Sequence, residues 1–175
     1  KRFVFLSLFP TDNHEYEALR EGLNKLLLTD SSISVMPTSI PSLGKGFLCG
    51  FLGLLHADVT KERLTREFNL NLITSMPTVE YQIRLKSGII ISIQSADDFP
   101  NPAEIQEIKE PVMFCEIFTA KIYLGSIMQL CQDKRAKYVD LKYIADQAQL
   151  SYLIPLSEMI IDFFDKIKSV SQGYA

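Results

Sequence analysis

The chain has 175 residues, enough for one domain of average size or two small ones. It carries 18 lysines and arginines against 21 aspartates and glutamates, a net charge of −3 that argues against a strongly basic nucleic-acid-binding domain. Hydrophobic residues make up 47% and charged residues 22%, which excludes intrinsic disorder, and the longest apolar run, residues 47–55, is far shorter than the ~20 residues that a membrane span needs.

The first half of the chain predicts the element order βαββαβ. Its opening apolar run is typical of a central strand, and Asp12 and Glu15 have capping-box spacing at the start of an amphipathic helix. Gly50 and Gly53, inside the third predicted strand, indicate a bulge or a close backbone approach. The expected elements are a strand at 3–9, a helix ending before 29–31, a strand from 33–35, a Pro-, Ser- and Gly-rich loop at 37–46, a strand at 47–54, a helix at 57–68 and a strand from 72–74.

The second half repeats this order after an intervening segment. Residues 79–85 and 89–93 alternate like a hairpin around Ser87 and Gly88, and a proline-stiffened connector is expected over 97–102. The expected elements of the repeat are a strand at 112–118, a helix with Tyr123, Ile127, Leu130 and Cys131 on one face, strands at 138–144 and 149–154, and a helix at 156–167. The sequence therefore predicts an α+β fold with two ferredoxin-like βαββαβ sandwiches in tandem. Either the chain is a cut fragment or the second copy lacks its last strand.

The usual catalytic motifs are absent. Gly44 and Lys45 precede Gly46 instead of a hydroxyl residue, and Ser39 stands where a phosphate-binding loop has its first glycine. Two histidines, His14 and His56, are too few for the common zinc motifs. Three scattered cysteines, Cys49, Cys115 and Cys131, are typical of buried reduced thiols in a cytosolic protein. We therefore expect that this stretch of chain is not itself an enzyme.

Several motifs resemble one family. The run from Gly50 to His56 (Gly-Phe-Leu-Gly-Leu-Leu-His) and the end of the chain, with Pro155-Leu156, Asp162-Phe163-Phe164-Asp165 and Gly173-Tyr174-Ala175, resemble the LepA (elongation factor 4) family of ribosome-associated translational GTPases, related to elongation factor G. The resemblance spans essentially the whole chain. The motif residues to which it gives a structural or interdomain role are Gly50, Gly53, His56, Pro155, Phe163 and Phe164.

The resemblance implies a fragment of a larger protein. Residues 1–86 resemble domain III, 87–107 form the hairpin end and connector, and 108–175 resemble domain V. Partners would be the ribosome and the parent's own GTPase domain, which would bind GTP and Mg²⁺; no cofactor and no zinc are expected in the fragment. A cytoplasmic location is implied, with peripheral attachment to the cytoplasmic membrane face and an organellar homologue left open, and no leader or transmembrane segment is signalled.

Two basic clusters are candidates for contact with ribosomal RNA. Lys134, Arg135 and Lys137 form the densest one, and a solvated helix end explains them equally well. Lys61, Arg63 and Arg66 form the second, where neighbouring acids favour a structural explanation.

Two other functions remain open at this point. Lys45-Gly46-Phe47 on the third strand resembles the start of an RNP1 sequence of single-stranded-RNA-binding RRM domains, although Leu48 and Cys49 break the pattern. An ACT-like small-molecule regulatory module also uses ferredoxin-like units.

Overall fold

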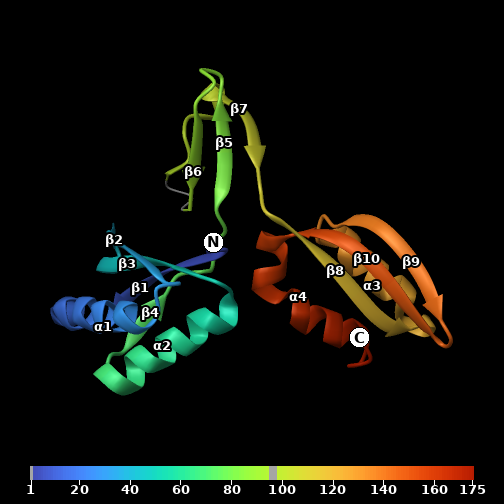
Figure 1. The fold of residues 1–175 in the computed structure, drawn as a ribbon, viewed down its shortest axis with the longest axis horizontal. Helices are drawn as coiled ribbons and strands as arrows, with labels where there is room; N and C mark the ends of the chain where they lie inside the picture. Colours follow the sequence, from blue (N-terminus) through green and yellow to red (C-terminus); the bar gives the residue numbers. More distant parts are fainter. Residues whose placement is uncertain (1, 95–97) are drawn as a thin grey trace. The chain divides into compact units, whose positions relative to one another are not determined.

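The computed structural model describes residues 2–94 and 98–175 (Figure 1). The chain divides into two compact units that are each assembled from two segments. Unit 1 comprises Lys1–Glu80 with Ser92–Ala103, and unit 2 comprises Tyr81–Ile91 with Glu104–Ala175.

The domain boundaries expected at residues 86 and 107 stay a prediction. Within the expected connector, Asp97 lies outside the described residues, and Pro102–Glu104 form a short 3-10 helix, η3.

Unit 1 contains one four-stranded antiparallel sheet with the order β2-β3-β1-β4. Its elements are β1 (Val4–Pro10), the 3-10 helix η1 (Asn13–Glu15), α1 (Tyr16–Thr29), β2 (Ser34–Ile40), β3 (Gly44–Phe51), α2 (Leu54–Phe68) and β4 (Leu72–Thr74). Each helix connects two parallel strands with one antiparallel strand between them, which is the split βαβ arrangement of a ferredoxin-like fold. The expected fold class of the first half is confirmed.

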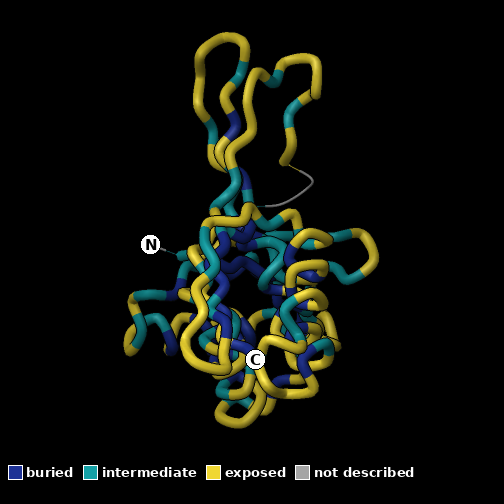
Figure 2. The backbone as a smooth tube through the Cα atoms, turned by 90° about the vertical axis from the view of Figure 1, so that its right-hand side faces the viewer, coloured by how far each residue is buried: buried dark blue, intermediate teal, exposed yellow. Residues whose placement is uncertain are grey.

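The core of unit 1 lies between the sheet and the two helices, which cover the same face of the sheet (Figure 1). Helix α1 contributes Leu19, Leu23 and Leu26, and α2 contributes Ala57 and Leu64, all nearly inaccessible to solvent. These positions recur at helical spacing because one stripe of each helix must face the sheet. In Figure 2 the buried segments of the chain are dark blue.

The loop expected over residues 37–46 was wrong in most of its length. Strand β2 continues to Ile40 and β3 begins at Gly44, so only residues 41–43 form the turn. Pro37 is paired with Phe47 inside β2. Proline has no amide hydrogen to donate to a neighbouring strand. An edge strand tolerates it where its nitrogen faces away from the sheet, and β2 is an edge strand.

A separate three-stranded sheet follows, and we call it the ribbon. Its strands are β5 (Tyr81–Leu85), β6 (Ile90–Ile93) and β7 (Ile105–Lys109), in the order β6-β5-β7. The hairpin around Gly88 is confirmed, and the glycine has a left-handed φ of 85° in the turn. The third strand, β7, was not expected from the sequence.

The remainder of unit 2 contains a three-stranded antiparallel sheet, in the order β8-β10-β9. Its elements are β8 (Val112–Ala120), the 3-10 helix η4 (Lys121–Tyr123), α3 (Leu124–Asp133), β9 (Lys137–Ile144), β10 (Gln147–Pro155) and α4 (Leu156–Val170). This order repeats the first three strands of unit 1 and confirms the second ferredoxin-like unit. Within the described residues, no strand follows α4.

The core of this part of unit 2 again lies between sheet and helices. Ile127 and Cys131 of α3 and Phe163 of α4 pack with Leu150 and Ile154 of β10. The broad apolar stripe that the sequence places on the last helix is therefore a core-packing face.

Candidate functional site

Arg135 lies two residues beyond the end of α3 and joins three segments of unit 2. Its guanidinium donates to Glu110, at Nη1–Oε1 2.7 Å and Nη2–Oε2 3.1 Å, and to Glu158 of α4, at Nε–Oε1 2.9 Å. These hydrogen bonds raise the pKa of Arg135, with the largest contribution from Glu110. Arg135 has a left-handed φ of 54°, the conformation in which the chain leaves a helix C-terminus.

Lys134 is the most enclosed cation of the first predicted cluster, with a side chain only 12% exposed. Its Nζ lies 2.5 Å from Asp162 Oδ1 and 3.6 Å from Glu158 Oε2, both on α4. The hydrogen bond from Lys134 lowers the pKa of Asp162, and the same bond raises the pKa of Lys134. Lys134 and Arg135 together with Glu110, Glu158 and Asp162 form what we call the clasp.

Lys137 does not join the clasp. It begins β9, is paired with Leu153 of β10 and is exposed. Among the described residues it forms no ion pair. The structure thus brings Lys134 and Arg135 together with acids, and among the described residues Lys137 is the exposed member of this cluster that has no ion pair.

The second predicted cluster lies on α2 and is also paired internally. Arg63 Nε is 2.7 Å from Glu67 Oε1, and Arg66 Nη2 is 2.6 Å from Glu62 Oε1, both at i,i+4 spacing. Lys61 is partly buried. Both arginines therefore already hold a carboxylate one helical turn away.

His56 of the family-like motif lies in the first turn of α2 and connects two loops. Its Nδ1 accepts from the Leu52 amide at 3.2 Å, so Nε2 carries the proton that it donates to Asp30 Oδ2 at 2.8 Å. The pKa of Asp30 is lowered, mainly by the hydrogen bond from the Ser32 hydroxyl and then by the Ser32 amide. His56 therefore fixes the start of α2 against the end of α1.

The glycines of the motif have different roles. A Cβ on Gly50 would lie 2.5 Å from Ser34 Oγ and 2.6 Å from the Phe5 ring, so this strand position requires glycine for close approach. Gly53 lies after β3 as the N-cap residue of α2, and a Cβ there would meet nothing within 4 Å. The close approach expected from the sequence exists at Gly50 and not at Gly53.

The three motif residues of unit 2 lie around α4. Pro155 ends β10 and immediately precedes the helix. Phe163 is buried in the core, whereas Phe164 is 56% exposed and meets the Phe163 ring edge-on at 6.0 Å. Pro155 and Phe163 have structural roles, and Phe164 is the member of the three that is available to a neighbour.

The RNP1-like residues of β3 do not form a base-stacking surface. Phe47 is 4% exposed and packs in the core, where its ring stacks on Tyr16 at 5.0 Å between centroids. RRM domains stack bases on rings that stand free on the open sheet face. This arrangement therefore disfavours RRM-like RNA binding by unit 1.

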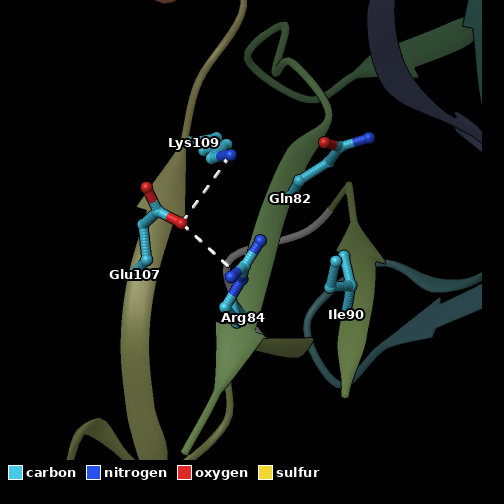
Figure 3. Close-up of a pocket in the computed structure, with 5 residues that line it drawn as sticks. All are labelled: Gln82, Arg84, Ile90, Glu107 and Lys109. Carbon is cyan, nitrogen blue, oxygen red and sulfur yellow. Dashed lines mark ion pairs between the residues drawn. The ribbon is translucent and has the colours of Figure 1, made fainter. Parts of the chain in front are cut away.

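The ribbon has a polar face that was not expected from the sequence (Figure 3). Arg84 of β5 and Lys109 of β7 each lie 3.7 Å from the same Glu107 carboxylate oxygen. Gln82 and Ile90 complete the lining of this shallow hollow. The alternation of Gln82 and Arg84 along β5 was the available signal.

Residues 2–94 and 98–175 contain neither a metal-binding cluster nor a membrane-spanning helix. No group of three or more His, Cys, Asp or Glu side chains there could hold a metal ion. No helix of this part of the chain is long and apolar enough to span a bilayer.

Residues 107–175 match the family model described as elongation factor G C-terminus. The match covers β8, α3, β9, β10 and α4 in full, the part of unit 2 that has the ferredoxin-like order. This segment is therefore similar to the C-terminal domain of elongation factor G, a translation factor.

Proposed function

We propose that the chain is the middle portion of a LepA-like (elongation factor 4) ribosome-dependent translational GTPase. The observation that carries this proposal is the elongation factor G C-terminus match of residues 107–175. The LepA-like motif in unit 1, centred on Gly50 and His56, and the ferredoxin-like strand order of unit 1 support extending it to the whole chain.

In this proposal the chain contacts the ribosome and couples those contacts to the parent's GTPase domain. GTP and Mg²⁺ would be bound by that domain, and GTP hydrolysis would belong to it. The parent would act in the cytoplasm, and peripheral association with the cytoplasmic membrane face is part of the same family-based proposal.

The internal ion pairs support a coupling role. Coupling between distant sites requires elements that move as units with discrete arrangements. The clasp holds α3, α4 and the segment before β8 together through Arg135 and Lys134. In unit 1, His56 and Asp30 hold α2 against the end of α1.

The proposal is tested by co-sedimentation of the 175-residue chain with purified bacterial ribosomes across a salt series. We expect the chain to pellet with ribosomes at low salt and to be released as salt rises. Absence of the chain from the ribosome pellet at every salt concentration, with circular dichroism confirming the fold, would contradict the proposal.

Lys137→Glu is the sharper variant for the first predicted cluster. Lys134 and Arg135 hold acids inside unit 2, so reversing their charges would change folding and binding together. Lys137 is exposed and has no ionic partner among the described residues, so its reversal tests ribosome contact alone. We expect weaker pelleting with an unchanged melting temperature.

A further inference from the structure

The ribbon presents one polar face with more positive than negative charge. Gln82 is paired with Lys109 and Arg84 with Glu107, so these four side chains share a face of the β5-β7 pair. Lys86 lies in the turn directly after β5 and is exposed. Two cations, Arg84 and Lys109, therefore accompany one acid, Glu107, on this face, in a chain whose net charge is −3.

The ion pairs on this face are looser than those in the basic clusters predicted from the sequence. Arg84 Nε and Lys109 Nζ each lie 3.7 Å from Glu107 Oε2, beyond hydrogen-bond distance. Their side chains are 45% and 57% exposed. One carboxylate oxygen serves both cations, as Figure 3 shows, so neither charge is fully neutralised.

The helix clusters differ in this respect. Arg66 lies 2.6 Å and Arg63 lies 2.7 Å from its own carboxylate, and Lys134 lies 2.5 Å from Asp162. A phosphate that approached these cations would have to displace a close charge-assisted pair. On the ribbon it would compete only with Glu107 at longer range.

We propose that this ribbon face binds the phosphodiester backbone of structured RNA, with Arg84 and Lys109 as the phosphate-binding residues. The choice of RNA as the ligand rests on the proposed function. The choice of this surface rests on its excess of positive charge and on the long ion-pair distances of Arg84 and Lys109. The arginine can bind two phosphate oxygens in its plane, and the lysine contributes a point charge. Gln82 adds an amide donor beside Lys109.

The face would recognise backbone rather than sequence. Among the described residues, its lining contains no aromatic ring on which a base could stack. The contacts would therefore position RNA and depend strongly on salt. This binding mode differs from the stacking surface of an RRM domain.

The test is fluorescence anisotropy with a fluorescein-labelled RNA hairpin of about 24 nucleotides at several salt concentrations. For the double variant R84Q/K109Q we expect about tenfold weaker binding at 100 mM salt and a log–log salt slope smaller by about two. For E107Q we expect about threefold tighter binding, because the competing carboxylate is removed. A variant that unfolds would lose affinity for the RNA, so unfolding cannot explain a gain in affinity by E107Q.

The matched control is R20Q/R66Q. These arginines hold close pairs on α1 and α2, at 2.6 Å from Glu17 and Glu62, so the control removes the same net charge from another surface. Equal losses in R84Q/K109Q and R20Q/R66Q would overturn the proposal, as would unchanged binding by R84Q/K109Q.

Ribosome co-sedimentation separates the two proposals. If the unmodified chain and R84Q/K109Q pellet equally with ribosomes and bind the hairpin equally, the ribbon face does not bind RNA, and the proposed function stands. If the unmodified chain binds neither ribosomes nor the hairpin, the proposed function itself is wrong. Displacement of the hairpin by polyglutamate at equal charge concentration would indicate an acidic protein partner and overturn the choice of RNA.

Discussion

Arg135 and Glu110 form a two-point ion pair, with Nη1–Oε1 at 2.7 Å and Nη2–Oε2 at 3.1 Å. Twenty-five residues of sequence separate them, and Glu158 of α4 meets the same guanidinium. Arg135, which the sequence places in a basic cluster, thus connects the segment before β8 to α4. Surface pairs contribute little singly, but a bidentate arginine with two acids contributes more.

Replacing Arg135 by glutamine should lower the free energy of unfolding of unit 2 by about 1–2 kcal/mol, because charge-assisted hydrogen bonds are lost and solvent screening limits the effect. Urea denaturation measures it. Arg63→Gln is the control, since it removes one i,i+4 pair with Glu67 and should leave stability nearly unchanged. Equal stabilities for the two variants would show that the clasp does not stabilise unit 2.

Gly46→Ala should destabilise unit 1 by about 1–3 kcal/mol, the usual cost of overpacking. A Cβ at Gly46 would lie 2.4 Å from the Leu8 carbonyl oxygen and 2.4 Å from the Phe9 ring, and the backbone atom cannot turn aside. Gly53→Ala is the matched control because its Cβ meets nothing within 4 Å. Thermal melts of both variants decide the matter, and similar melting temperatures would refute the predicted close approach.

The sequence predicted the strand and helix order well because hydrophobic periodicity is a local signal. Prediction from the sequence failed for features that depend on residues far apart in the chain. The acidic partners of Lys134 and Arg135 lie 23–28 residues away, so their pairing could not be inferred from sequence spacing. Pro37 suggested a loop because proline is unfavourable inside most strands. It is tolerated here because β2 is an edge strand, which is a property of the assembled sheet.

The ribbon shows the same limit. Strand β7 has only five residues, too few for a clear sequence pattern. That Glu107 and Lys109 share a face with Arg84 and Gln82 follows only from the pairing of β7 with β5. The hairpin of β5 and β6 was predictable because Gly88 marks a turn between two runs of alternating residues.

Thiol reactivity should follow burial. Burial raises the pKa of Cys49 and of Cys131 to about 12, while Cys115 is only partly buried. At pH 8 we expect an aromatic disulfide reagent to modify Cys115 first and the other two only after unfolding, because the thiolate is the reactive form. Cys115→Ser should abolish the first phase. Rapid titration of all three thiols in the folded protein would contradict the prediction.

Acid should weaken unit 1 through Asp30. The Ser32 hydroxyl, with the Ser32 amide and His56, lowers the pKa of Asp30 in the folded chain below its unfolded value. A depressed carboxylate pKa gives stability that is fully present above the unfolded pKa, about 3.9, and is lost as pH falls through the lower folded value. Urea midpoints between pH 6 and pH 2.5 should therefore fall below about pH 4. Asp30→Asn should be less stable at pH 6 and show a shallower acid decline than the unmodified chain, and a parallel decline would show that Asp30 does not carry this acid sensitivity.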